Sequence, residues 1–146
     1  VLRPSNVYGP FQNLVKPQGI IGFAFKAIKN NLTLDLYDEG KVIRDFIYVD
    51  DLASSVEKFL NTNIIAGNTS FYNVGSEEGI SIKGILDNIE KITGEKLQLN
   101  YKTSRNFDCE YNVLDTSKLN QQTAWSKETT LDEGLINVWE WIKSDN

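Results

Sequence analysis

The sequence predicts an α/β fold, a small mixed sheet with helices, within one domain that spans residues 1–146. Short apolar stretches with the two-residue period of strands alternate with longer stretches whose apolar residues recur at helical spacing. A chain of 146 residues is long enough to bury a sizeable core, and its 40% hydrophobic and 24% charged residues are ordinary for a globular protein.

The chain begins with an apolar strand at Val1 and Leu2. Pro4 cannot donate a backbone hydrogen bond, so we expect the chain to leave the sheet between residues 3 and 6. A loop at residues 11–16 follows.

A helix is predicted from Pro17 to Asn30, because proline is favoured at the first helical position. Apolar residues cover most of its circumference, which indicates burial on more than one side. In residues 32–37 leucine alternates with polar side chains, as in a half-buried strand.

Residues 38–40, Asp-Glu-Gly, predict a turn that joins this strand to a neighbouring strand at residues 42–49. The Asp50-Asp51 pair comes directly after the second strand, and its carboxylates are suited to capping a helix.

The rest of the chain alternates helices and strands. In order, the sequence predicts a helix with Leu52, Ala53, Val56, Phe59 and Leu60 in the core, a loop at 61–68, a strand at 70–74, a turn at 75–79, a helix at 82–93, a strand at 97–101, a short helix after residue 115 and a last helix after residue 130. Ser81 and Gly94 are suited to begin and end their helix, and Asp115 to cap the next. Thr130 and Glu133 predict a capping box.

Composition excludes several kinds of function. The net charge of −5 argues against a nucleic acid or an anionic membrane as partner. No apolar run approaches the ~20 residues needed to span a bilayer and no signal peptide opens the chain, so we expect a cytoplasmic location. Cys109 is the only cysteine and histidine is absent, which argues against an internal disulfide, Ser-His or Cys-His catalysis and any common metal site.

Arg44 lies in an otherwise apolar and aromatic strand, and the residues alone leave two interpretations open. In the commoner one, Arg44 forms a weak surface ion pair with Asp45 or another nearby acid. In the other, its guanidinium is held near the rim of the sheet and binds a phosphate through two hydrogen bonds at once.

The stretch YDEGKVIRDFIYVDDLA at residues 37–53 resembles the signature in the C-terminal half of the NAD-dependent epimerase/dehydratase family, the extended short-chain dehydrogenases that act on nucleotide sugars. Further segments similar to this family are RPSNVYGP at 3–10, YNVG at 72–75, the R-x-x-D pattern at 105–108 and DTSK at 115–118. The resemblance covers nearly the whole chain. It implies the C-terminal substrate part of such an enzyme, lacking most of the Rossmann domain. Phe107 stands where the family usually has glycine, and Thr123-Ala124 where it usually has leucine and glycine.

The resemblance also implies which residues bind ligands. Those implied to contact the nucleotide sugar are Asn6 on the sugar side, Asp35, Leu36 and Tyr37 along the uracil or other base, Arg44 and Arg105 at the diphosphate, and Asp108 at the ribose. Pro4 and Ser5 would lie beside the nicotinamide of NAD.

Two parts of the family's machinery are missing from the sequence. The G-x-G-x-x-G turn that holds a dinucleotide is absent. Tyr37 and Lys41 have the spacing of the family's catalytic pair, but Asp-Glu-Gly between them predicts a turn rather than a helix. We therefore expect no catalytic residue in this chain and no NAD bound to it, and we expect the chain to be a piece of a longer enzyme that uses NAD.

The expected function is to bind the nucleotide sugar for an NAD-dependent enzyme, first of all a UDP-hexose 4-epimerase. A nucleotide-sugar 4,6-dehydratase or decarboxylase of the same family, and a binding module without a catalytic half, are the alternatives. The expected partner is a UDP-sugar or another nucleotide sugar. The full-length enzyme would be a homodimer, and this chain alone would self-associate through strand edges that lack the rest of their sheet.

Overall fold

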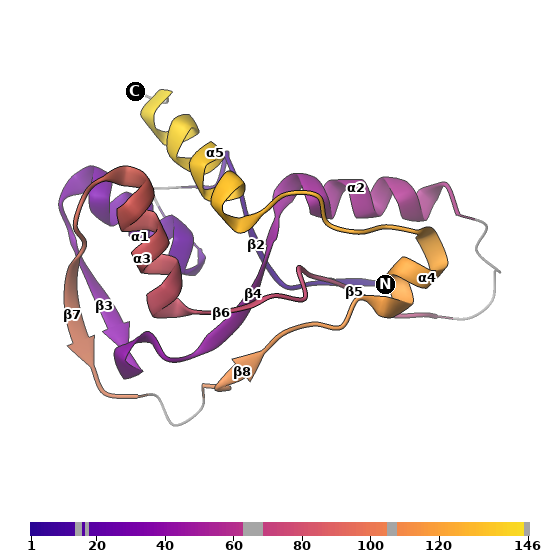
Figure 1. Ribbon diagram of the computed structural model, residues 1–146, viewed down its shortest axis with the longest axis horizontal. Helices are drawn as coiled ribbons and strands as arrows, with labels where there is room; N and C mark the ends of the chain where they lie inside the picture. Colours follow the sequence, from indigo (N-terminus) through magenta and orange to yellow (C-terminus); the bar gives the residue numbers. More distant parts are fainter. Residues whose placement is uncertain (14–15, 17, 63–68, 105–107, 145–146) are drawn as a thin grey trace.

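The computed structural model describes residues 1–13, 16, 18–62, 69–104 and 108–144. Its strands are β1 (Leu2–Pro4), β2 (Asn6–Tyr8), β3 (Thr33–Tyr37), β4 (Ile43–Tyr48), β5 (Tyr72–Val74), β6 (Gly79–Ser81), β7 (Gln98–Lys102) and β8 (Tyr111–Asn112). Its helices are α1 (Gly19–Asn30), the 3₁₀ turn η1 (Asp38–Gly40), α2 (Val49–Leu60), α3 (Ile82–Thr93), α4 (Ser117–Thr123) and α5 (Leu131–Ser144). Figure 1 shows an elongated molecule, with α1, α3, β3 and β7 at one end, α2 and α4 at the other, and β4 running between them.

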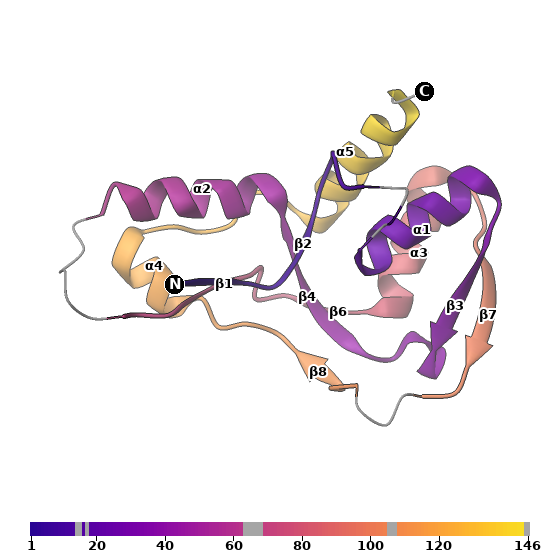
Figure 2. The same cartoon turned by 180° about the vertical axis from the view of Figure 1, so that it is seen from behind.

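The described strands form three small sheets. β1 pairs with β5 and β3 pairs with β7, both in parallel. β4 is parallel to β2 and β8 and antiparallel to β6. Figure 2 shows β3 and β7 side by side at the far end of the molecule from α2. This mixture of parallel and antiparallel pairs confirms the predicted α/β class with a mixed sheet.

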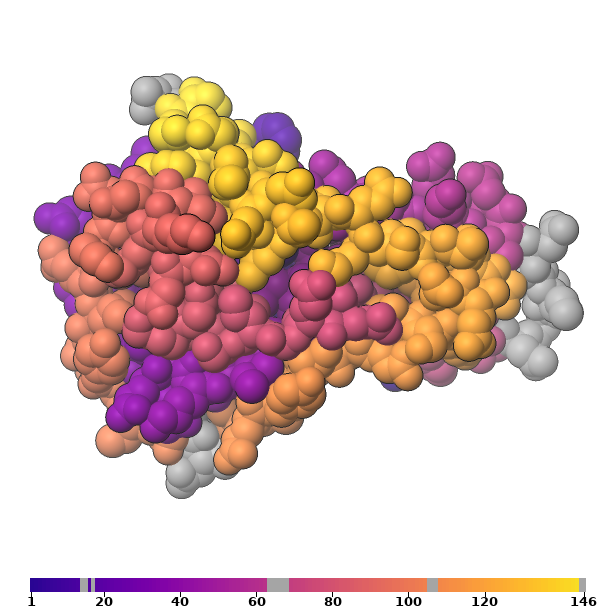
Figure 3. Space-filling model, viewed as in Figure 1, coloured from indigo at the N-terminus to yellow at the C-terminus, as the bar shows by residue number. Residues whose placement is uncertain are grey.

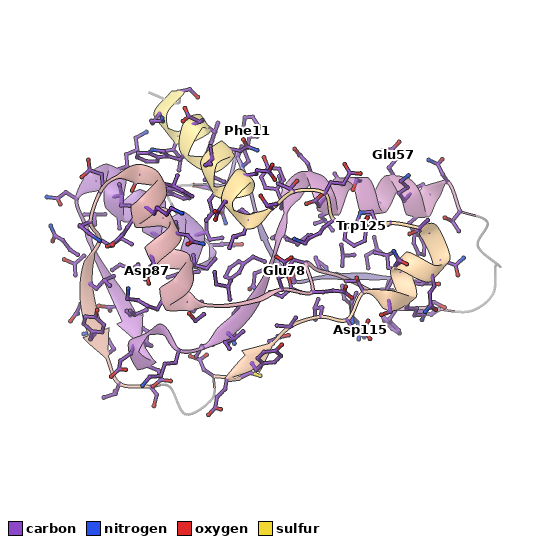
Figure 4. All side chains as sticks on the ribbon, viewed as in Figure 1. Phe11, Glu57, Glu78, Asp87, Asp115 and Trp125 are labelled. Carbon is purple, nitrogen blue, oxygen red and sulfur yellow. The ribbon has the colours of Figure 1, made fainter. Side chains whose placement is uncertain are left out.

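β4 separates two hydrophobic clusters. Since side chains alternate across a strand, Phe46 and Tyr48 enter one cluster and Ile47 enters the other. The first cluster is formed mainly by α1, α3, α5 and β3. The second gathers around Tyr72 and Trp125, and Figure 4 shows Trp125 between α2 and α4. A single strand therefore forms part of both cores.

The helices of the first cluster agree with the prediction. Phe25 of α1 is fully buried and stacks on Trp139 of α5, with 5.8 Å between ring centroids. The Ser81 hydroxyl caps α3 by accepting a hydrogen bond from the Gly84 N–H at 3.0 Å. Gly94 ends the same helix in the left-handed conformation, at a φ of 75°.

The predicted capping box at the start of α5 is also present. Thr130 N donates to Glu133 Oε2 at 2.9 Å, and Glu133 N donates to Thr130 Oγ1 at 3.3 Å. These two bonds satisfy backbone donors that would otherwise be free at the helix end.

The predicted hairpin between residues 32–37 and 42–49 is wrong. β3 pairs with β7 along its whole length, from Thr33–Gln98 to Tyr37–Lys102. The three residues of η1 have φ values of 48°, 53° and 73°, so a left-handed turn carries the chain out of one sheet and into another. Turn residues in a sequence mark where the chain changes direction, but not which strand becomes the partner.

The predicted cap of α2 is wrong as well. α2 begins at Val49 with Tyr48 as its N-cap, without a side-chain capping bond. Asp51 instead accepts hydrogen bonds from the backbone N–H groups of Glu128 and Thr129, at 3.0 and 3.2 Å. Its buried carboxylate thus anchors the segment that leads into α5.

Three further predictions need correction. On α2, Leu52 and Phe59 pack against the second cluster, but Ala53, Val56 and Leu60 are exposed. Pro4 lies within β1, opposite Val74, and the chain passes to the next sheet only after it. An edge strand with a single partner tolerates proline, because one side of its backbone needs no ladder bonds. The short strands β6 and β8 were not predicted, since two or three residues are too few for a periodic pattern.

Candidate functional site

A groove with a volume of about 600 Å³ opens where β3 and β4 diverge after η1. We call it the β3–β4 groove. Its apolar lining comes from α1, β3, the start of β4 and the start of α3, namely Ile20, Phe23, Leu34, Leu36, Val42 and Ile82. Its polar lining includes Asp35, Tyr37, Arg44 and Asp108. Figure 3 shows the purple surface of η1 and the orange surface around β8 at the same lower edge of the molecule. Five of the seven residues predicted to bind a nucleotide sugar therefore line one groove.

One side of the groove is formed by the edge of β3. All five residues of β3 line it, although successive side chains point to opposite faces of a strand. The groove must therefore run along the strand's edge, where the backbone is accessible. In the described part of the chain, β3 pairs only with β7, so the N–H and C=O groups on this edge have no strand partner. The Asp35 carboxylate accepts a hydrogen bond from Asn100 Nδ2 of β7 at 2.7 Å, which turns it towards the other edge.

Arg44 provides the positive charge of the groove. Its Nη1 donates to the carbonyl oxygens of Ile43 at 2.8 Å and Cys109 at 2.6 Å. Among the described residues, no carboxylate lies within ion-pair distance of Arg44, and its Nε and Nη2 have no protein acceptor. The interpretation of Arg44 as half of a surface ion pair with Asp45 is therefore wrong. A partly buried cation held by two carbonyls, with donors to spare, is suited to an anion.

The second predicted cation cannot be placed. Arg105 lies outside the described residues, together with Asn106 and Phe107, so its contact with phosphate stays a prediction. Asp108 is described, and its exposed side chain lines the β3–β4 groove.

Asn6, Pro4 and Ser5 do not line the groove. Asn6 is opposite Phe46 in the β2–β4 pair, two residues along β4 from Arg44. Its Nδ2 donates to the backbone carbonyl of Asp45 at 2.7 Å. Since a carbonyl only accepts, this bond fixes the amide orientation and turns Asn6 Oδ1 away as an acceptor. The predicted positions of Pro4 and Ser5 beside a nicotinamide stay predictions.

Asp45 is the residue that the sequence analysis missed. It is 1% exposed, and its Oδ1 accepts hydrogen bonds from the Ser76 N–H and hydroxyl, both at 2.8 Å, and from the Ser5 hydroxyl at 3.1 Å. Its Oδ2 accepts one from Leu114 N at 3.2 Å. The available signal was an acid inside an apolar strand, next to the arginine, which points to a carboxylate with buried partners.

The tyrosines of the chain do not form a catalytic base. Tyr37 ends β3, and Lys41 lies beyond the left-handed turn, where its Nζ pairs with Glu39 at 2.8 Å. Tyr8 lines a smaller cavity of about 220 Å³ beside the Glu78–Lys127 ion pair, and Glu78 is marked in Figure 4. Burial, reinforced by the negative charge of Asp51, raises the pKa of Tyr8, which makes it a weaker acid and unsuited to start as a phenolate.

Within the described ranges, no cluster of three or more acidic or cysteine side chains is positioned to hold a metal ion. Among the helices that the structure describes, none is long and apolar enough to cross a membrane.

Residues 1–75 match the model of the NAD dependent epimerase/dehydratase family. The full chain is 30% identical to a putative UDP-glucose 4-epimerase of Methanocaldococcus jannaschii and covers 46% of it. It superposes with a TM-score of 0.87 on the UDP-glucose 4-epimerase of Thermotoga maritima with UDP-glucose, at 25% identity, covering 98% of this chain and 45% of that one. For the UDP-glucuronic acid 4-epimerase of Bacillus cereus in complex with UDP-glucuronic acid and NAD, the TM-score is 0.85 at 30% identity, over 98% and 44%. The chain spans less than half the length of these relatives.

Proposed function

Because this chain belongs to the NAD-dependent epimerase/dehydratase family, we propose that it is the part of a longer enzyme that binds a nucleotide-sugar substrate. For the whole enzyme we propose 4-epimerisation of a UDP-hexose. A relative named as a putative UDP-glucose 4-epimerase is 30% identical over the full chain, which favours this reaction over the dehydratase and decarboxylase alternatives.

The observation that carries the proposal is the β3–β4 groove, with a free strand edge on one side and Arg44 without a carboxylate partner in it. A nucleoside diphosphate needs both features. The flat base would receive hydrogen bonds from the free N–H and C=O groups of β3, with the apolar side chains of α1 beside it. The diphosphate would be bound by Arg44, through the guanidinium edge that the protein leaves free.

The remaining predicted contacts complete this arrangement. Asp108 would accept a hydrogen bond from a ribose hydroxyl, and Arg105 would add a second cation at the diphosphate. The Oδ1 of Asn6, fixed as an acceptor by Asp45, would receive a hydroxyl of the sugar. These side chains bind and orient the substrate and transfer no proton or hydride.

The residues of this chain do not fit the pyrophosphate of NAD. A dinucleotide site needs a glycine-rich turn between a strand and a helix N-terminus free of negative charge. Here β4 passes directly into α2, and the first turn of α2 contains Asp50 and Asp51. Two carboxylates there would repel a pyrophosphate. We therefore propose that NAD is held by a part of the enzyme that this chain does not contain.

The proposal is tested with the protein at its natural full length. Steady-state assays with NAD on UDP-glucose, UDP-galactose, UDP-glucuronic acid and dTDP-glucose should show interconversion of 4-epimers for a UDP-sugar. Release of a 4-keto product from dTDP-glucose would identify a dehydratase instead. Absence of UDP binding by calorimetry would reject the nucleotide-sugar site altogether.

A second test uses the 146-residue chain itself. It should neither retain NAD through purification nor epimerise any of these sugars, because it lacks a dinucleotide turn and a helical tyrosine–lysine pair. Stoichiometric NAD bound to this chain would contradict the division of roles proposed here.

A further inference from the structure

The buried carboxylate of Asp45 connects three segments that are distant in sequence. Ser5 joins β1 to β2, Ser76 follows β5, and Leu114 follows β8. In the described chain, Asp45 has hydrogen-bond donors but no cation within ion-pair distance. A charge kept from water in this way is costly unless its donors are held in place, so the three segments are arranged around the carboxylate.

Close packing shows that this site is built for a carboxylate. A Cβ atom on Gly75 would lie 2.3 Å from Asp45 Oδ2, so a side chain at that position would displace the carboxylate. Only glycine lets the backbone approach so closely.

Each connected segment supports a residue of the proposed substrate site. Ser5 precedes Asn6, and the Asn6 amide donates to the carbonyl of Asp45 itself. The segment that ends at Leu114 carries Asp108 and the Cys109 carbonyl that holds Nη1 of Arg44.

Asp45 itself faces away from the ligand. Arg44 lines the β3–β4 groove, whereas its neighbour Asp45 points to the opposite side of β4, the side of Ile47 and the second cluster. Any effect of Asp45 on ligand binding must therefore pass through the residues that it holds.

We propose that Asp45 is a positioning residue that fixes Arg44 and the Asp108 segment against each other, so that together they bind the diphosphate of the substrate. This inference rests on the proposed function. It assigns to Asp45 the diphosphate part of the binding and not the base part, since Asp45 contacts no residue of β3.

The test compares the dissociation constants of uridine and UDP, measured by NMR titration on the full-length protein and on Asp45→Asn. Asparagine keeps the shape but places an NH₂ group against a backbone N–H. We expect the ratio of the uridine to the UDP dissociation constant to fall at least tenfold, while the constant for uridine stays within twofold. General loosening of the fold would weaken both ligands alike.

Asp51→Asn is the matched control. Asp51 is also a buried carboxylate that accepts two backbone N–H bonds, but it anchors the segment before α5 and does not touch the groove. It should lower the melting temperature and leave the uridine-to-UDP ratio unchanged. An equal change of the ratio in both variants would overturn the proposal.

Ser76→Ala is the milder second variant, because it removes one hydroxyl donor and keeps the carboxylate. It should lower the ratio about threefold. If Asp45→Asn does not fold, an unchanged ratio in Ser76→Ala overturns the proposal, as does a folded Asp45→Asn with the wild-type ratio. If the unsubstituted protein binds UDP no better than uridine, the proposed diphosphate site itself is wrong.

Discussion

Replacing Arg44 by alanine should weaken UDP binding by roughly tenfold to a hundredfold. Nη1 is already engaged by the Ile43 and Cys109 carbonyls, so Nε and Nη2 are the donors available to a phosphate. A hydrogen bond to a charged group contributes ~1.5–3 kcal/mol, and ~1.4 kcal/mol corresponds to a factor of ten. One such bond at the lower limit gives about tenfold. Two give about a hundredfold, and we expect no more, because Arg44 is only partly buried and solvent screens its charge.

The assay is calorimetric titration of UDP into the full-length protein at two salt concentrations. Affinity of the unsubstituted protein should fall as salt rises, and this dependence should be smaller in Arg44→Ala. Arg44→Lys should fall between the two, because lysine keeps the charge but cannot make two parallel hydrogen bonds.

Lys41→Ala serves as the control for lost positive charge. Lys41 is three residues away, its side chain is 65% exposed and paired with Glu39, and it does not line the groove. Its substitution should leave UDP affinity unchanged. An Arg44→Ala protein that melts normally and binds UDP as tightly as the unsubstituted protein would remove Arg44 from the site.

Three further predictions concern folding and association. Gly40→Ala should lower the melting temperature much more than Gly94→Ala, because both glycines have positive φ but a Cβ on Gly40 would lie 2.8 Å from the Lys83 backbone nitrogen, while Gly94 faces open space. Hydrogen bonds from Thr130 hold the pKa of Glu133 below its usual value, so the capping box stabilises α5 above the ordinary pKa of 4.5 and is lost as the pH falls through the lowered folded-state value. Melting temperatures of Thr130→Ala and the unsubstituted protein should therefore differ at neutral pH and converge in acid. The 146-residue chain should self-associate at low micromolar concentration by light scattering, or exchange the amides of β1 and β5 quickly, because these strands pair only with each other in the described part of the chain and exposed apolar residues of α2 lie at the same end. A monomer with both strands strongly protected would contradict this.

Sequence reasoning succeeded where the determining contacts are local. The caps of α3 and α5 depend on residues three positions apart, Ser81 with Gly84 and Thr130 with Glu133. It failed where a partner is distant in sequence. Thr33 pairs with Gln98, and no local pattern distinguishes that partner from the nearer β4, so a hairpin was the natural but wrong expectation.

The candidate site shows the same division. Resemblance to a family pointed to five residues that the structure brings to one groove, although their roles stay predictions. Asp45 was missed because its partners, Ser5, Ser76 and Leu114, come from three other parts of the chain. Only the folded structure shows that one carboxylate joins them.

The sharing of β4 by two hydrophobic clusters also bears on how the protein loses its structure. If the cluster around Phe46 and Tyr48 opens, β4 loses the support of one face, and Ile47 on the other face loses the wall that keeps it from water. Neither end of this elongated molecule is then free to melt alone. We expect a single cooperative transition, with the slowest-exchanging amides in β4 and not in the longer helices. The strand that carries the proposed substrate arginine would be the last part of the chain to lose its order.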